Sequence, residues 1–130
     1  MRLGFHHVAV IVSDYALSKA FYCDVLGLDV LAENYREERG SWKLDLALDD
    51  GGQLELFSLP EPGLRPSRPE ACGLRHLAWR VCDLDAAIAE LEGRGVPVEP
   101  VRIDEFTGRR FTFFQAPAGL PLDLYDVPYL

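Results

Sequence analysis

Apolar and polar residues alternate in four short segments of the chain, and each alternation predicts a strand with one apolar face. The segments are residues 5–12 (FHHVAVIV), 53–59 (QLELFSL), 74–82 (LRHLAWRVC) and 122–126 (LDLYD). In all four, aliphatic side chains occupy one face, and the opposite face carries an ionisable residue. The four ionisable residues are His7, Glu55, His76 and Asp123.

Two further segments have the periodicity of helices. The first helix is predicted to start after Asp14 and end at Gly27, and the second to start after Asp83 and end at Gly95. Their apolar stripes are formed by Leu17, Phe21 and Val25 in the first helix, and by Leu84, Ala87, Ile88 and Leu91 in the second. Asp83 follows directly on a predicted strand, and one residue, Ser13, separates Asp14 from the strand before it.

The chain is read as two copies of one unit. Residues 28–36, 42–50, 96–103 and 109–114 are also strand-like, so each half has the order β-α-β-β-β. The two histidines lie 69 residues apart (76−7) and the two carboxylates 68 apart (123−55). This spacing indicates an internal repeat. We expect module 1 at residues 1–59, a proline-rich linker at 60–73 and module 2 at 74–130.

Length and charge exclude several classes of protein. The chain has 130 residues, 48% of them hydrophobic, which suits one globular domain with a real core. A net charge of −8 disfavours nucleic acid and anionic membranes as partners. No run reaches the roughly 18–20 apolar residues of a membrane span. Three cysteines without a CxxC motif give no disulfide framework, and we expect a cytoplasmic protein.

The ionisable residues of the four strands predict a metal site. A single strand histidine or glutamate is usually packed or solvent-facing, but here four such residues recur on matching faces of two repeats. Two imidazoles and two carboxylates are donors typical of Zn, Ni, Co, Mn or Fe(II) sites. Apolar side chains flank them, as in a ligand pocket: Phe5, Phe57, Leu74 and Tyr125. We therefore expect one divalent ion held by His7, Glu55, His76 and Asp123.

Three stretches carry a family resemblance: residues 6–28 (HHVAVIVSDYALSKAFYCDVLGL), 73–96 (GLRHLAWRVCDLDAAIAELEGRGV) and 114–126 (FQAPAGLPLDLYD). Together they resemble the vicinal oxygen chelate superfamily, which includes glyoxalase I, bleomycin-resistance proteins, fosfomycin-resistance enzymes and extradiol dioxygenases. The resemblance implies an α+β fold, with two βαβββ modules in tandem forming a curled mixed sheet around a metal cleft and helices on the outer face. It also implies a homodimer, with sites formed within one chain or across two.

Carried over by motif, the same four residues become the metal ligands, and this set leans towards a small glyoxalase I-like bacterial branch. The resemblance implies a lyase or isomerase whose small substrate chelates the metal through neighbouring oxygens. Glu55 and Asp123 would move the proton. The last ligand is Asp123 where glyoxalase I usually has glutamate, and APAG at residues 116–119 replaces the usual DPDG. Alternatives are a non-catalytic binding protein that sequesters a small molecule, an Fe(II) dioxygenase and a thiol transferase.

Side chains near the expected pocket edges are candidates for substrate contacts. Basic and aromatic residues occur in YREERGSWK and TGRR, and a cation there suits a carboxylate or a phosphate. The alternative for each charged residue is a solvated side chain on a strand or turn. The candidates are Arg36, Trp42, Lys43, Phe57, Arg109 and Tyr125.

Overall fold

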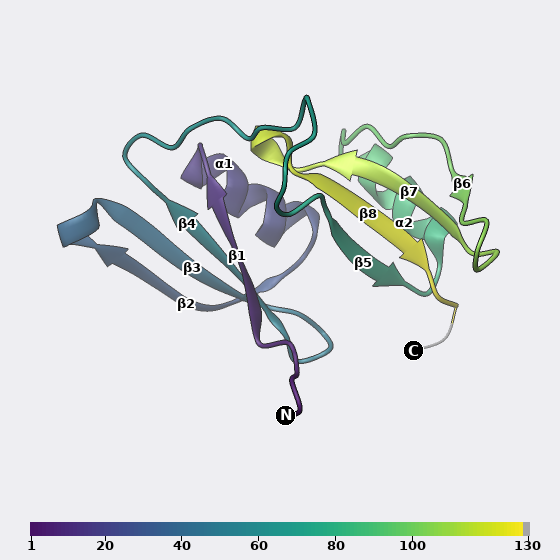
Figure 1. The fold of residues 1–130 in the computed structure, drawn as a ribbon, viewed down its shortest axis with the longest axis horizontal. Coiled ribbons are helices and arrows are strands. Elements are labelled where there is room, and N and C mark those ends of the chain that lie inside the picture. Colours follow the sequence, from purple (N-terminus) through teal and green to yellow (C-terminus); the bar gives the residue numbers. More distant parts are fainter. Residues whose placement is uncertain (129–130) are drawn as a thin grey trace. The chain divides into compact units, whose positions relative to one another are not determined.

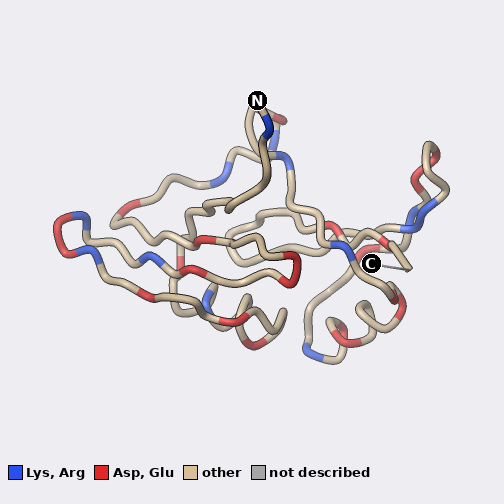
Figure 2. The backbone as a smooth tube through the Cα atoms, turned by 90° about the horizontal axis from the view of Figure 1, so that it is seen from below, with Lys and Arg blue, Asp and Glu red and all other residues tan. Residues whose placement is uncertain are grey.

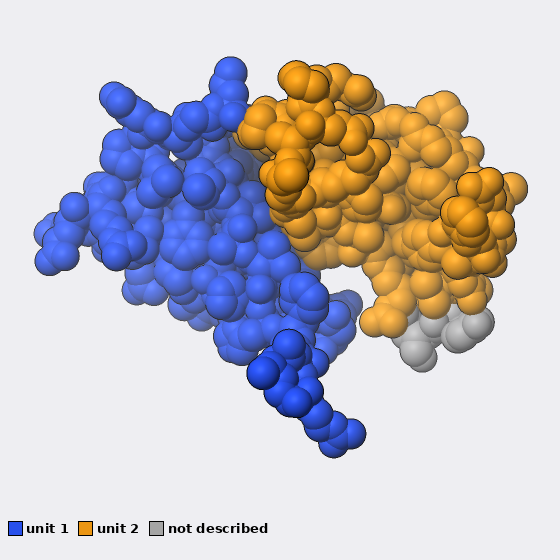
Figure 3. All heavy atoms as spheres, in the orientation of Figure 1, with its two compact units in different colours: residues 1–64 blue, residues 65–130 orange. Residues whose placement is uncertain are grey.

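The computed structural model describes residues 1–128 and divides into two compact units, Met1–Leu64 and Arg65–Leu130 (Figure 3). The division falls inside the segment that we expected to be a linker, and the last two residues of the expected second module lie outside the described residues. Each unit contains a four-stranded mixed sheet, which confirms the α+β class and the tandem modules. No helix within residues 1–128 is long and apolar enough to cross a bilayer.

Unit 1 has its strands in the order β1-β4-β3-β2 (Figure 1). β1 pairs in parallel with β4, and the other two pairings are antiparallel. Its elements are β1 (His7–Val12), α1 (Tyr15–Ala20), the π-helix η1 (Phe21–Val25), β2 (Asp29–Arg36), the 3₁₀ turn η2 (Glu37–Arg39), β3 (Ser41–Ala47) and β4 (Gln53–Ser58).

Unit 2 repeats this plan with the order β5-β8-β7-β6, and again the first and last strands of the unit are parallel neighbours. α2 lies against β8 (Figure 1). The elements are β5 (Leu77–Val81), α2 (Leu84–Gly93), β6 (Arg102–Ile103), β7 (Arg110–Gln115), the 3₁₀ turn η3 (Pro117–Gly119) and β8 (Pro121–Asp126).

The predicted aliphatic faces form the cores. Leu54 and Leu56 of β4 are at most 1% exposed, and Leu122 and Leu124 of β8 at most 5%. They lie on the face opposite the carboxylates, as strand alternation requires. Further buried side chains come from the neighbouring strands and helices: Leu44, Leu46, Phe21 and Tyr22 in unit 1, and Phe114, Leu84 and Leu91 in unit 2.

Both helices begin at the predicted aspartates. A carboxylate oxygen of Asp14 accepts from a backbone N–H three residues on at 3.0 Å, and Asp83 does the same in unit 2. The first helix then departs from the prediction, because α1 passes after Ala20 into the π-turn of η1. The buried residues Ser18, Phe21 and Tyr22 keep helical spacing, but Leu17 is 56% exposed, so the predicted apolar stripe is wrong at Leu17.

Several predicted strands are shorter in the structure, and two of these differences concern unit 2. The strand predicted at residues 96–103 is only Arg102–Ile103 in the structure, because Pro97 and Pro100 have no backbone N–H to donate to a neighbouring strand. Isolated bonds still hold the segment beside β7: the Glu99 N–H donates to the Phe113 carbonyl at 2.9 Å. In the other case β5 begins at Leu77, so His76 directly precedes the strand.

Candidate functional site

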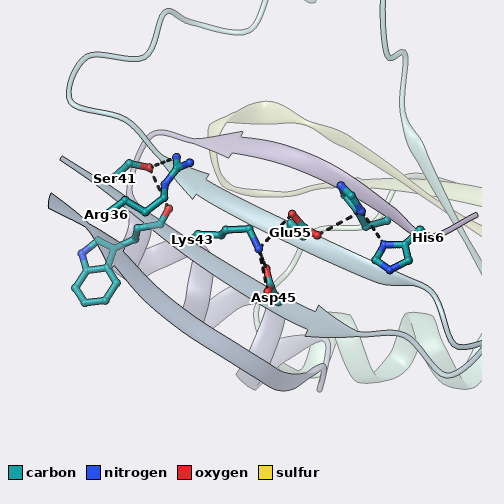
Figure 4. A network of polar contacts seen from close by, with 8 residues as sticks. His6, Arg36, Ser41, Lys43, Asp45 and Glu55 are labelled. Atoms are coloured by element: carbon teal, nitrogen blue, oxygen red, sulfur yellow. Dashed lines mark hydrogen bonds and ion pairs between the residues drawn. The ribbon is translucent and has the colours of Figure 1, made fainter. Parts of the chain in front are cut away.

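The parallel pairing of β1 with β4 brings His7 and Glu55 together in unit 1. Figure 4 shows Glu55 with Lys43 and Asp45 nearby on the same sheet. Ala9 is the register partner of Glu55, so His7 and Glu55 are diagonal neighbours on one sheet face. His7 Nδ1 lies 3.4 Å from Glu55 Oε2. Glu55 is only 7% exposed although it is on the polar face. His6 adds a ring contact beyond this pair, with its Nδ1 2.9 Å from His7 Nδ1.

A lysine and a second carboxylate complete this group. Asp45 of β3 is the register partner of Glu55 and faces the same way. Lys43 Nζ donates to both carboxylate oxygens of Asp45, at 2.8 and 3.0 Å, and lies 3.6 Å from Glu55 Oε1. The hydrogen bond to Asp45 raises the pKa of Lys43. Lys43 thus separates two carboxylates that would otherwise repel each other.

Unit 2 has the equivalent pair. His76 Nε2 lies 3.8 Å from Asp123 Oδ2, and Asp123 is only 6% exposed. Burial raises the pKa of Asp123, while His76 and Arg102 act in the opposite direction. Oδ1 of Asp123 is buried with no hydrogen-bond partner among the residues that the structure describes. A buried carboxylate oxygen without a donor is costly, and a cation would satisfy it.

Aromatic rings line the same face of unit 2. The His76 ring meets Phe113 edge to face at 5.2 Å between centroids, and Phe111 stacks on Tyr125 at 6.1 Å. The Tyr125 hydroxyl donates to Asp104 Oδ2 at 2.8 Å, which ties its outer end to the turn before β7. Two of the expected flanking side chains, Phe5 in unit 1 and Leu74 in unit 2, precede their strands and are 88% and 48% exposed.

The predicted substrate contacts fall into separate groups. Arg36, Lys43 and Phe57 lie together on the polar face of unit 1, where both cations lie over the Phe57 ring. Trp42 points to the other face of β3 and stacks on Tyr15 of α1, with ring centroids 5.4 Å apart. The structure therefore does not bring Trp42 to the polar face.

The remaining predicted cation, Arg109, lies in unit 2 at the end of the turn before β7. Its Nη1 donates to the Asp126 carbonyl at 3.5 Å. Asp45 is the residue that the sequence reasoning missed. The alternation in WKLDLA already places Asp45 on the face of Lys43, but its pairing with Glu55 depends on strand register.

The chemistry of the donors suits a divalent metal ion. Each unit supplies one imidazole and one largely buried carboxylate, so the two pairs together give two nitrogen and two oxygen donors. Within residues 1–128, no group of three or more His, Cys, Asp and Glu side chains is close enough to hold a metal. Each unit thus contributes one histidine–carboxylate pair, and the unsatisfied Asp123 Oδ1 is the atom that best fits a ligand role.

The chain belongs to the Glyoxalase/Bleomycin resistance protein/Dioxygenase superfamily, whose sequence model matches residues 4–124. It is 60% identical to the uncharacterized protein YaeR of Escherichia coli over 121 residues, which cover 93% of this chain and 94% of YaeR. A crystal structure of a glyoxalase family protein from Enterococcus faecalis is 47% identical, with a TM-score of 0.89 over 95% of this chain and 97% of that chain.

Other similar proteins differ in what they do. A 2-epi-5-epi-valiolone epimerase from an Actinomyces species is 31% identical over 95% of this chain and 79% of the epimerase. A lactoylglutathione lyase from Agrobacterium tumefaciens and the fosfomycin resistance protein FosX from Listeria monocytogenes share only the fold, at 21% and 16% identity. Membership of the superfamily therefore leaves the reaction open.

Proposed function

We propose that this protein is a metal-dependent enzyme of the glyoxalase type, a lyase or isomerase that acts on a small substrate with two neighbouring oxygens. One observation carries the proposal. Each unit places an imidazole nitrogen within 4.0 Å of a buried carboxylate, at corresponding positions of a repeated fold. A repeated histidine or carboxylate with only a packing role would not need to recur as a pair.

His7, Glu55, His76 and Asp123 are the proposed ligands of one divalent ion, which would be Zn, Ni, Co, Mn or Fe(II). The ion would supply Lewis acidity, which lowers the pKa of a C–H beside a carbonyl. The buried oxygen of Asp123 without a hydrogen-bond donor supports this role. The pairs would meet within one chain or across a homodimer, and we propose the homodimer on the strength of the family alone.

Glu55 and Asp123 are also the proposed proton carriers. Burial raises the pKa of Asp123 in the metal-free protein, and a bound cation would act in the opposite direction. Lys43, 3.6 Å from Glu55 Oε1, would offset negative charge that develops beside that carboxylate. The similar epimerase is named for a change of configuration, and removal and return of a proton is one route to that outcome.

Metal binding is the first test. Protein stripped with EDTA is titrated with each of the five ions, and stoichiometry is measured by calorimetry and elemental analysis. We expect His76→Ala and Asp123→Asn to abolish tight binding and His6→Ala to retain it. If His6 and His7 alone formed a surface metal site, metal binding would be lost in His6→Ala and retained in His76→Ala. That result would refute the proposal. So would the absence of stoichiometric binding in the wild type.

Turnover is tested next on metal-loaded protein with 2-oxoaldehyde–thiol adducts and α-hydroxycarbonyl compounds. We expect conversion that requires His7 and His76. Tight binding of such compounds without conversion, unchanged in His7→Ala, would instead identify a sequestering protein.

A further inference from the structure

Arg36, the last residue of β2, is held in place at one end of the polar face of unit 1 (Figure 4). Its guanidinium carbon lies 4.8 Å from the centre of the Phe57 ring. Its Nη2 donates to Ser41 Oγ at 2.8 Å, and Ser41 is fully buried. Nε is buried without a hydrogen-bond partner among the described residues. Nη1 and the second N–H of Nη2 have no partner among the described residues, so these donors remain for a ligand.

The charge of Arg36 has no carboxylate partner. Within residues 1–128, no carboxylate oxygen lies within 4.0 Å of its guanidinium, although the 21 acidic residues are spread over both units (Figure 2). The other half-buried cations bind acids or backbone carbonyls: Lys19 with Glu33, Lys43 with Asp45 and Glu55, Arg110 with Asp85, Arg65 with the carbonyls of Leu74 and Arg75, and Arg109 with that of Asp126.

A half-buried guanidinium without a counter-charge has lost part of its hydration energy, and no carboxylate compensates for that loss. Such a group gains more from an incoming anion than an exposed, fully hydrated arginine does. A surface hollow beside it is lined by Tyr35, Arg36, Glu37, Glu38 and Arg39. The two glutamates there are exposed, and neither is paired with Arg36.

The position of Arg36 relates it to the proposed metal ligands. Phe57, whose ring lies against the Arg36 guanidinium, is two residues beyond Glu55 on the same face of β4. Two residues of a strand span roughly 7 Å. Lys43 lies between Arg36 and Glu55, but its ammonium group already forms ion pairs with Asp45 and Glu55. Arg36 is therefore the cation on this face that is left for a ligand.

We propose that Arg36 is an anion-binding residue that selects substrates with a carboxylate or phosphate group a few bonds from the oxygens that react. The role of Arg36 in substrate selection rests on the proposed function, because it specifies the class of substrate that the proposed enzyme would accept. The binding of the anion itself needs no metal. Phe57 and Ser41 fix the guanidinium in advance, so little side-chain entropy is lost when the anion binds.

The test uses metal-free, isotopically labelled full-length protein titrated with inorganic phosphate or acetate at constant ionic strength. We expect a saturable shift of the Arg36 Nε–H resonance, identified from its absence in Arg36→Lys. In the variants that lack this resonance, binding is followed through the backbone amide resonances of residues 37–41, and Arg36→Gln should weaken binding of the preferred anion at least tenfold. The stronger of the two titrations tells a phosphate site from a carboxylate site.

Arg2→Gln is the control, since it removes the same charge from an exposed residue of unit 1 that does not line the hollow. It should bind the anion within twofold of wild type. Equal weakening in both variants would show only a diffuse charge effect and would overturn the proposal, as would the absence of a saturable shift. Arg36→Lys keeps the charge without the planar group and should fall between the two.

Metal affinity measured without anion distinguishes the proposal of a metal site from the proposal of an anion site at Arg36. It should be equal in wild type and Arg36→Gln. Anion binding without any metal binding would refute the metal site and leave the anion site standing, and the opposite result would do the reverse.

Discussion

Replacing Asp123 by asparagine should stabilise the metal-free protein. The carboxylate is 6% exposed, its Oδ1 has no hydrogen-bond partner within residues 1–128, and its Oδ2 is 3.8 Å from the nearest nitrogen of His76. A neutral amide of almost the same shape removes the buried charge. We therefore expect the substitution to disable the proposed metal site and to improve folding at the same time.

The size of the gain follows from two opposing contributions. An unsatisfied buried polar group costs about 1–3 kcal/mol, and more when it is charged. The asparagine amide also lacks partners at this position and keeps part of that cost, while the attraction to His76 and Arg102 is lost. We expect a net gain of about 1 kcal/mol in the free energy of unfolding at pH 7.

Urea unfolding in EDTA, followed by circular dichroism at pH 7 and pH 5, measures this difference. Because burial raises the pKa of Asp123 above its ordinary 3.8, the folded wild type binds its proton at a higher pH than the unfolded chain does. Lowering the pH toward that raised pKa therefore stabilises the wild type. Asp123→Asn lacks this contribution, so its advantage should narrow at pH 5.

Glu55→Gln is the control at the equivalent position of unit 1. Glu55 has His7 and Lys43 as partners, so its replacement should bring no gain in stability. Adding the preferred metal ion should raise the unfolding midpoint of the wild type and leave that of Asp123→Asn unchanged. An Asp123→Asn variant less stable than wild type in EDTA would show that the carboxylate is satisfied in the folded protein, and the reasoning would fail.

Three further outcomes are expected. Lys43→Met leaves Asp45 and Glu55 facing each other and should lower the free energy of unfolding by about 0.5–1 kcal/mol in urea titrations; unchanged stability would mean that the two carboxylates do not repel. Asp83→Ala removes the cap of α2 and should lower it by about 1 kcal/mol in thermal unfolding; no loss would mean that the helix start is held by other contacts. Burial raises the pKa of Tyr22 to about 12, so the ultraviolet titration lost in Tyr22→Phe should centre near that pH rather than near 10.

Strand faces could be predicted from the sequence because alternation is a local property. The pattern around Glu55 placed Leu54 and Leu56 in the core, and both are buried. The same holds for Leu122 and Leu124 on either side of Asp123. The fold class followed from the repeat of these patterns, and the superfamily from the motifs within them.

Pairing between distant segments could not be predicted in this way. The position of Asp45 opposite Glu55 depends on the register of β3 against β4, which the sequence does not state. The exposure of Leu17 and the burial of its neighbour Ser18 depend on how α1 packs in unit 1, which the spacing of apolar residues did not state. Trp42 is different, since alternation alone places it opposite Lys43.

The parallel pairing of the first and last strands of each unit determines when the first strand can pair during translation. His7 pairs with Gln53, 46 residues later (53−7), and Leu77 pairs with Leu122, 45 residues later (122−77). At ribosomal speeds of about 5–20 residues per second, the first strand waits roughly 2–9 s for its partner. Throughout that interval a nascent valine-rich segment is unpaired, and we expect it to be a binding site for chaperones during translation.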